Sequence, residues 1–246
     1  MNNYRSAVST ILFVLAFVLA QPAAADQSFL KPYKLSYTTT YKFLLPLQGS
    51  ATRELLKTED NRWRINHKID SAVIKLRESS LFSYNENRIH PLDYDYRQSA
   101  LAKDREVSLR FDWARMLATN TTENPNIDIK LVPDALDKLN YQLQLRIDLA
   151  TRNQPGAYQL VDRKRLREYR FEVLGEELLE TAVGKLNTLK LRRLREPDAS
   201  RETVIWLAKD WDYLLVQIQQ EERGKSYEIL LSEGELDGTP ITGLNR

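Results

Sequence analysis

The segment RWRINHKI, residues 62–69, alternates between basic or polar side chains and apolar or aromatic ones. Trp63, Ile65 and Ile69 share one parity, and His67 falls in phase with them. A period of two is typical of a β-strand with one face buried and one face in water, because successive side chains point to opposite faces. The segment therefore predicts a half-buried strand on which His67 points inward.

The same alternation recurs on both sides of this segment, through most of the chain. It is visible in residues 35–43, 107–113, 169–173, 214–218 and 227–231. Short groups of turn-forming residues separate these stretches, at 58–61, 90–93, 123–126, 196–198 and 223–225. Short connections of this kind favour antiparallel hairpins. We predict a mostly β fold, built as a curved antiparallel sheet or as one or more half-barrels.

One segment, about 133–152, breaks the alternation. Leu136, Leu139, Leu143 and Ile147 recur there at helical spacing, and Pro133 suits the first turn of a helix. The apolar arc is wide, which is typical of a helix that packs against other elements. We predict one long helix over about 133–152, packed against the sheet.

The residues after the N-terminus contain no internal repeat, no low-complexity tract and no long linker. We therefore expect a single β-rich domain over residues 26–246. A sheet of two lobes, divided near the helix at 133–152, stays open as an alternative because strand-rich stretches flank the helix on both sides.

Residues 1–25 have the three-part pattern of a cleavable secretory signal. Arg5 gives a basic start, an apolar core covers 11–20, and small residues precede Asp26. The core is shorter than the ~20 apolar residues that a spanning helix needs. We expect cleavage after Ala25 and a soluble protein in the periplasm. With no cysteine to carry a lipid, we expect the mature form to be neither membrane-spanning nor a lipoprotein.

Charge and motif content exclude several functions. The 36 Lys and Arg residues nearly balance the 34 Asp and Glu residues, whereas nucleic-acid-binding domains usually carry a basic excess. Two histidines without cysteine make a zinc site unfavourable. The sequence holds no H-E-x-x-H, G-x-S-x-G or glycine-rich phosphate loop. We expect no nucleic-acid partner, no cofactor, no catalytic, cofactor-binding or metal-ligating residues, and no enzymatic activity.

Aromatic side chains on the predicted strands are the more informative feature. The simpler interpretation is a sheet core, since strands favour aromatic residues. The alternative is a sheet curved into a trough that holds an acyl chain or another apolar ligand. The residues predicted to line such a trough are Trp63, Ile65, His67, Tyr94, Tyr96, Phe111, Trp113 and Trp206.

Two parts of the chain carry a family pattern. A looser one joins a P-x-x-Y strand at 88–96 to an F-D-W strand at 107–113. A more specific one joins T-x-x-G-K at 181–185 to T-x-x-W-L-A-x-D at 203–210. Together they resemble the bacterial family called domain of unknown function 3108, although Leu215 stands where that family has a proline. The resemblance implies an exported, mostly antiparallel β protein with a helix between its halves, and it implies no catalytic residues.

Three functions are compatible with these observations. The favoured hypothesis is a non-enzymatic binding or carrier module for an apolar or amphipathic ligand of the cell envelope, such as a lipid. The second is a scaffold or assembly factor that binds an envelope protein by adding a strand to a sheet edge. The least favoured is an enzyme that acts on polysaccharide or peptidoglycan with paired carboxyl groups.

Overall fold

A computed structural model describes residues 29–42, 46–100, 104–195 and 200–244. The predicted signal peptide, residues 1–25, lies outside the described residues. The elements comprise one α-helix, one short 3-10 helix (Lys209–Trp211) and sixteen strands in a single sheet. The helix is α1 (Asn140–Arg152), and the strands are β1 (Tyr33–Lys42), β2 (Pro46–Lys57), β3 (Trp63–Ser71), β4 (Ile74–Asn85), β5 (Arg88–Ala100), β6 (Arg105–Asp112), β7 (Leu117–Asn120), β8 (Ile127–Lys130), β9 (Ala135–Leu136), β10 (Ala157–Asp162), β11 (Arg165–Thr181), β12 (Gly184–Leu194), β13 (Arg201–Ala208), β14 (Leu214–Glu222), β15 (Lys225–Leu236) and β16 (Thr239–Pro240).

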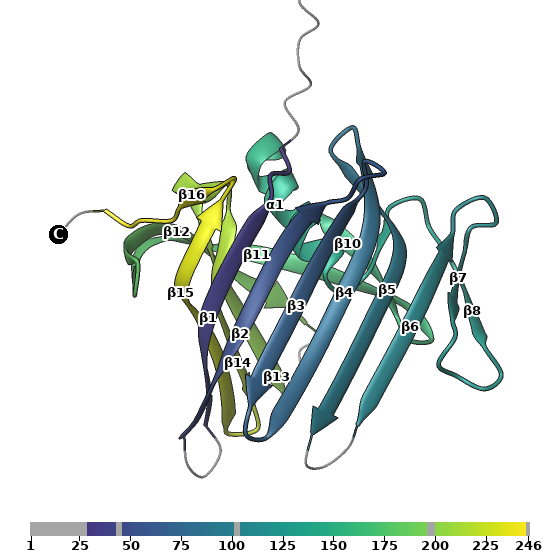
Figure 1. Cartoon of the computed structure of the whole chain (residues 1–246), viewed down its shortest axis with the longest axis horizontal. Helices are drawn as coiled ribbons and strands as arrows, with labels where there is room; N and C mark the ends of the chain where they lie inside the picture. The colour runs from purple at the N-terminus through teal and green to yellow at the C-terminus, as the bar shows by residue number, and fades with distance from the viewer. Residues whose placement is uncertain (1–28, 43–45, 101–103, 196–199, 245–246) are drawn as a thin grey trace, which may run out of the picture.

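The sheet is two meanders joined at one seam (Figure 1). Strands β1 to β8 follow one another outward on one side, and β15 back to β9 follow on the other. The seam is the antiparallel pair β1–β15, in which Thr38 lies opposite Leu230. The sheet is not closed, because β8 and β9 remain at its two ends. The predicted mostly β, antiparallel fold is confirmed.

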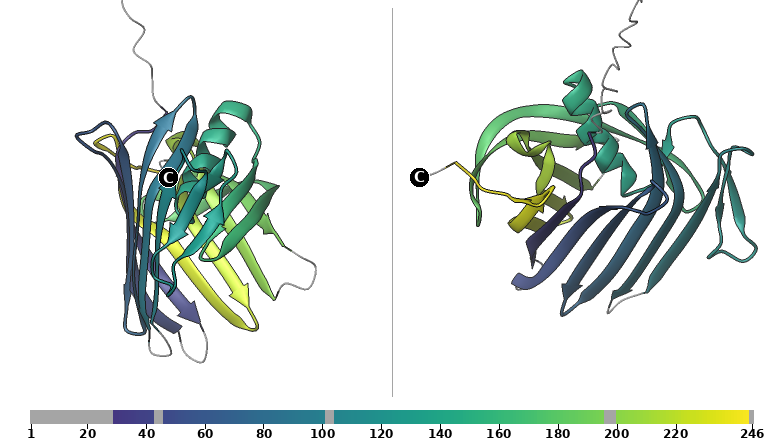
Figure 2. Two further views of the ribbon diagram at one scale, coloured as in Figure 1. Left: turned by 90° about the vertical axis from the view of Figure 1, so that its right-hand side faces the viewer. Right: turned by 45° about the horizontal axis from the view of Figure 1, so that its top comes forward.

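The sheet curls around the helix (Figure 2). We call β1–β6 the N-terminal wall and β11–β15 the C-terminal wall. Next to α1, side chains of Leu35 on the first wall and of Ile205 and Leu215 on the second surround one small space with Leu143. The helix therefore packs between the two walls rather than on a single face.

This position explains why α1 is buried on several sides. Leu143, Leu145, Ile147 and Leu149 are each at most 1% exposed. Full burial of one such side chain stabilises the fold by about 1.5–3 kcal/mol. The helix is thus a core element shared by both walls.

The helix begins at Asn140, seven residues later than the predicted start at Pro133. The residues between Pro133 and Asn140 are not helical. Ala135 and Leu136 form β9, which pairs in parallel with β10. The side chain of Asp137 then accepts hydrogen bonds from the first free backbone N–H groups of the helix. The periodic leucines of 136–139 are therefore core residues of a strand and a turn, not of a helix.

Candidate functional site

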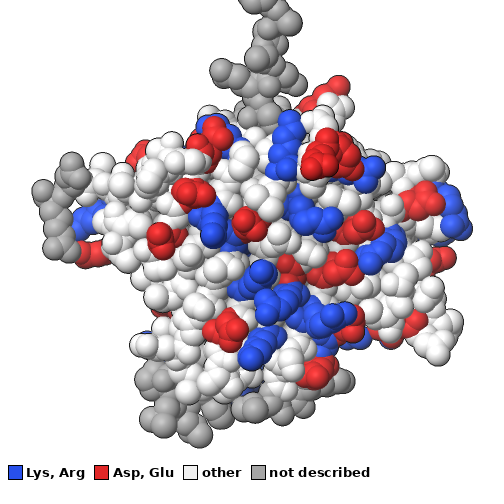
Figure 3. All heavy atoms as spheres, in the orientation of Figure 1, with Lys and Arg blue, Asp and Glu red and all other residues white. Residues whose placement is uncertain are grey.

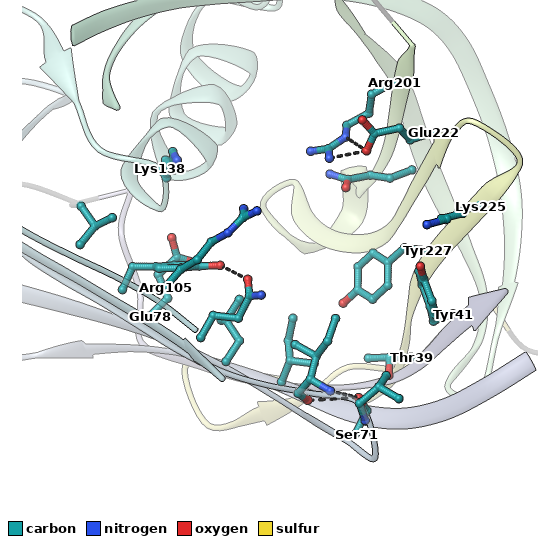
Figure 4. Close-up of a pocket in the computed structure, with 18 of the residues that line it drawn as sticks. Thr39, Tyr41, Ser71, Glu78, Arg105, Lys138, Arg201, Glu222, Lys225 and Tyr227 are labelled. Atoms are coloured by element: carbon teal, nitrogen blue, oxygen red, sulfur yellow. Dashed lines mark hydrogen bonds and ion pairs between the residues drawn. The ribbon is translucent and has the colours of Figure 1, made fainter. Parts of the chain in front are cut away.

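A cavity of about 1130 Å³ lies between the two walls. Its lining side chains flank the hairpin connections of both walls, for example Tyr41 and Ser71 on one side and Arg201 and Lys225 on the other (Figure 4). Lys138, just before α1, lies at its inner end. The cavity therefore opens at the end of the sheet opposite α1, where the hairpin connections gather, at the bottom of Figure 1.

The cavity combines an apolar floor with many polar groups. Six aliphatic and six tyrosine side chains line it, together with eight cationic and four carboxylic side chains. The aliphatic residues are Leu47, Ile69, Val73, Ile74, Leu76 and Val107, and the tyrosines are Tyr41, Tyr94, Tyr96, Tyr141, Tyr169 and Tyr227. Cations exceed carboxyl groups in the lining by four (8 − 4). Two of the cations, Lys138 and Arg163, form ion pairs with Asp162 and Glu123 outside the lining, so the positive excess is smaller than this count.

The four carboxyl groups of the lining are engaged by neighbours. Glu222 forms an ion pair with Arg201, and Glu106 does so with Arg97. Asp104 accepts hydrogen bonds from Ser99 and from the backbone of Ala100. Glu78 accepts a hydrogen bond of 2.5 Å from the hydroxyl of Tyr94. Burial raises the pKa of the Glu78 carboxyl, because the charged form loses its hydration.

A second buried carboxyl group, Asp137, lies outside the cavity lining. Its Oδ1 accepts the N–H groups of Leu139 and Asn140, both at 2.8 Å. Its Oδ2 accepts the hydroxyl of Ser80 at 2.5 Å. Burial raises the pKa of Asp137 to about 7. Because all these contacts hold the start of α1, the unusual pKa belongs to a structural cap.

Two of the eight residues predicted to line a trough, Tyr94 and Tyr96, line the cavity. Trp63, Ile65 and His67 point inward as expected, but they are at most 7% exposed and lie in the packed part of the molecule. The Nδ1 of His67 lies 3.1 Å from the carbonyl oxygen of Thr52. Burial, with the charge of Arg53, lowers the pKa of His67 to about 3, so its ring stays neutral.

The other three predicted residues lie elsewhere. Phe111 is buried in the core, and Trp113 donates its indole N–H to the carbonyl of Pro91 at 2.7 Å. Ile205 and Leu207 point from β13 toward α1, so Trp206 between them points to the opposite face of the sheet. The ammonium group of Lys190 lies over the Trp206 ring.

Six of the eight residues thus lie outside the lining of this cavity. Alternation along a strand indicates a face, but it does not indicate where the space between two walls is filled. Ligand contact at the eight residues stays a prediction.

Sequence reasoning missed the cations of the cavity. A solvated strand face is the ordinary interpretation of a basic pair such as 192–193, yet Arg193 lines the cavity, as do Arg195 and Arg201. Their parity carried the signal: Arg193 and Arg195 continue the inward alternation of Leu191, which is fully buried. Inward arginines at the ends of predicted strands were therefore a readable feature.

Basic residues also gather on the outer face of the N-terminal wall (Figure 3). Lys68, Arg77 and Arg97 lie opposite one another on β3, β4 and β5, and all three are exposed. Arg97 forms an ion pair with Glu106. Arg77 and Arg97 therefore lie on the outer face, away from the cavity, and can serve as controls for the arginines that line it.

The described residues hold no group of three or more His, Asp or Glu side chains that could bind a metal ion. None of its helices is long and apolar enough to cross a membrane.

Comparisons with known proteins add a family and a fold. The profile of the family described as "Protein of unknown function (DUF3108)" matches residues 33–231. No curated protein shows significant sequence similarity to this chain.

Among solved structures, the fold is similar to a beta-barrel-like protein of domain of unknown function DUF1849 from Brucella abortus. The TM-score is 0.55 at 9% identity, over 84% of this chain and 98% of that one. Two weaker likenesses carry no argument. A DUF1329 family protein from Desulfovibrio piger has a TM-score of 0.30 at 12% identity, over 84% of this chain and 86% of that one. A putative outer membrane lipoprotein-sorting protein domain from Vibrio parahaemolyticus has 0.26 at 12% identity, over 90% and 89%.

Proposed function

The chain belongs to the DUF3108 family of proteins of unknown function, and we propose that it is a non-enzymatic binding or carrier protein of the periplasm. Its ligand is an amphipathic molecule of the cell envelope, held in the cavity between the N-terminal and C-terminal walls. The family match and the fold leave the ligand open, so the cavity itself carries the proposal.

The observation that carries the proposal is the size and chemistry of this cavity. Ligand pockets commonly measure about 300–1,000 Å³ and combine apolar walls with a few polar groups. The cavity of about 1130 Å³ reaches this size, and its lining combines aliphatic side chains such as Ile74 and Leu76 with charged groups. A sheet that only packed a core would leave no such space.

The absence of a free carboxyl pair in the lining supports a non-enzymatic role. Hydrolysis of a glycosidic bond needs one acid and one base on either side of the bond. The four lining carboxyl groups have structural partners, and Asp137 caps a helix outside the cavity. The arrangement therefore favours binding over hydrolysis.

The N-terminal pattern of residues 1–25 supports the periplasm as the location. Release of the protein by osmotic shock, with a mature mass that begins at Asp26, is the expected result. Retention in the cytoplasm with residues 1–25 intact would contradict the location.

Filling the cavity tests the binding function. Leu76→Trp places a large ring into the space from β4, and we expect it to abolish the lipid that native mass spectrometry detects after gentle extraction. Lys75→Trp is the matched control, because the side chain of Lys75, next to Leu76 on the same strand, points to the outer face and is exposed. A wild-type protein that carries and accepts no amphipathic ligand would overturn the proposal.

A second candidate function is attachment of an envelope protein at a sheet edge. Beyond Arg170, β11 pairs only with β12, so its other backbone edge pairs with no described strand. Val173, Leu174 and Leu178 along this stretch are exposed by 44%, 42% and 59%. Free edges with apolar side chains are sites of strand addition. Capture of a specific envelope protein by crosslinking in cells from position 178 would favour this function.

A further inference from the structure

Three arginines gather on one side of the cavity, at the ends of β12 and β13. Arg193 lies at the end of β12, Arg195 directly follows that strand, and Arg201 begins β13. The guanidinium of Arg193 lies over the ring of Tyr169. Arg195 donates to the hydroxyl of Thr203 at 3.3 Å. We call Arg193, Arg195 and Arg201 the arginine cluster.

The arginine cluster has fewer carboxyl partners than charges. Within the described residues, Arg201 pairs with Glu222 through an Nε–Oε2 bond of 2.9 Å, whereas no ion pair engages Arg193 or Arg195. Burial lowers the pKa of both these arginines, and the charges of Arg193 and Arg201 lower that of Arg195 further. Like charges held together in a partly buried place are unfavourable unless an anion joins them.

Several donors of this region also lack a partner. The Nε atoms of Arg193 and Arg195 are buried and have no hydrogen-bond partner in the described structure. The same holds for the hydroxyl of Tyr227 on β15, a residue that lines the cavity (Figure 4). Buried donors without acceptors cost about 1–3 kcal/mol each, so these are polar atoms of the lining residues that no described neighbour satisfies.

We propose that the arginine cluster binds the acidic head of the ligand, while the aliphatic side chains around Leu76 hold its apolar part. The ligand is then an anionic amphiphile with a phosphate or carboxylate head. Guanidinium groups suit both heads, because their planar N–H forks match two oxygens at once. This inference rests on the proposed binding function and specifies its ligand class.

The alternative explanation is a solvated basic rim with no ligand. That explanation accounts for Arg105 and Lys225, which are exposed at the opening. It accounts less well for Arg193 and Arg195, which are half-buried and have no carboxylate partner among the described residues. The arginine cluster is therefore distinct from the rest of the cationic lining.

Binding of matched amphiphiles tests the inference. The delipidated full protein is titrated calorimetrically, below micelle formation, with lysophosphatidic acid, a fatty acid and lysophosphatidylcholine of the same chain, and with inorganic phosphate alone. We expect both acidic amphiphiles to bind at least about tenfold more tightly than the choline lipid, because charge-assisted hydrogen bonds to the acidic head contribute binding free energy of that size. We expect inorganic phosphate to bind far more weakly than either.

Variants assign the effect to the arginine cluster. Arg193→Gln and Arg195→Gln should each weaken the acidic amphiphiles about tenfold and leave the choline lipid unchanged. Arg195→Lys keeps the positive charge but loses the planar fork of donors, so it should weaken the acidic amphiphiles less, and it keeps the test decisive if a glutamine variant misfolds. Arg77→Gln, on the exposed outer row, is the matched control and should change nothing.

The outcomes separate this inference from the function on which it rests. Equal affinity for acidic and choline lipids would overturn the acidic head while the binding function stands. Inorganic phosphate as tight as lysophosphatidic acid would overturn the amphiphile and leave a free-anion site. Binding of none of the four would overturn the binding function itself.

Discussion

At the residue scale, Asp137 links three parts of the molecule. Its carboxyl group accepts the backbone N–H groups of Leu139 and Asn140 and the hydroxyl of Ser80 on β4. The Asp137 side chain is fully buried, so water does not compete for these hydrogen bonds. Asp137 is therefore one of the side chains that hold the start of α1 against the N-terminal wall, together with Asn140 and Gln144.

Replacing Asp137 should destabilise the protein. Asp137→Ala removes a helix cap and leaves buried donors unpaired, so we expect the free energy of unfolding to fall by about 2–3 kcal/mol. Urea denaturation measures the change. Asp134→Asn is the control, because Asp134 is exposed nearby, and it should have little effect. A change of similar size in both variants would contradict the capping role.

The pH dependence has a definite sign. Burial raises the pKa of Asp137 from 3.8 to about 7. Between about pH 4 and 7, Asp137 keeps its proton in the folded protein but loses it in the unfolded chain. The contribution of this proton to the free energy of unfolding is therefore complete below pH 4 and is lost as the pH rises to 7. Asp137→Asn cannot titrate, so its stability relative to wild type should rise over that interval. His67 acts in the opposite direction, because its lowered pKa of about 3 costs stability as the pH falls below 6.5.

At the element scale, β11 is the longest of the described strands. It has 17 residues, of which only Arg165–Arg170 pair with β10. Natural sheets protect free edges with charged side chains and β-bulges, and the unpaired stretch of β11 has four glutamates and a bulge between Val173 and Gly175. Leu178 is nevertheless exposed by 59%, which is the reason for considering a protein partner there.

Leu178→Lys should abolish association through this edge. A charge on the strand opposes pairing with another chain, so we expect crosslinks to an envelope protein and self-association at high concentration to disappear. The free energy of unfolding should change by less than about 0.5 kcal/mol, since the residue is exposed. Leu194→Lys, at a comparably exposed leucine of β12, is the control. Persistent crosslinks in the first variant would exclude this edge as the docking site.

At the scale of the whole molecule, the β1–β15 seam decides how the two walls cooperate. It joins residues about 190 positions apart along the chain, such as Thr38 and Leu230. The helix packs against both walls, so neither wall completes its core alone. We therefore propose that residues 26–246 fold as one domain.

Unfolding followed at one tryptophan per wall tests this unity. Trp63 reports on the N-terminal wall and Trp206 on the C-terminal wall, and both are buried. In two variants that each keep one of them, with the other tryptophans changed to phenylalanine, we expect the same urea midpoint for fluorescence and for circular dichroism. Two separate midpoints in the two variants would instead favour two independent lobes.

The sequence by itself determined what depends on neighbouring residues. The period of two placed strands and their inward faces, including His67 and Ile65, because side-chain direction follows from local backbone geometry. The helical spacing located α1 but placed its start too early. Ala135 and Leu136 pair with β10 instead of starting the helix. This pairing joins segments more than 20 residues apart, so the local spacing did not predict it.

Only the tertiary structure decided where the cavity lies and what lines it. Each strand pattern indicates a face, but the width between the walls depends on how sixteen strands curl and on where α1 fills the space. Inward residues beside α1, such as Trp63, are packed, whereas inward residues near the hairpin connections, such as Arg193 and Tyr96, line the cavity. Curvature is the sum of many small twists between distant strands, so the site is a property of the whole sheet.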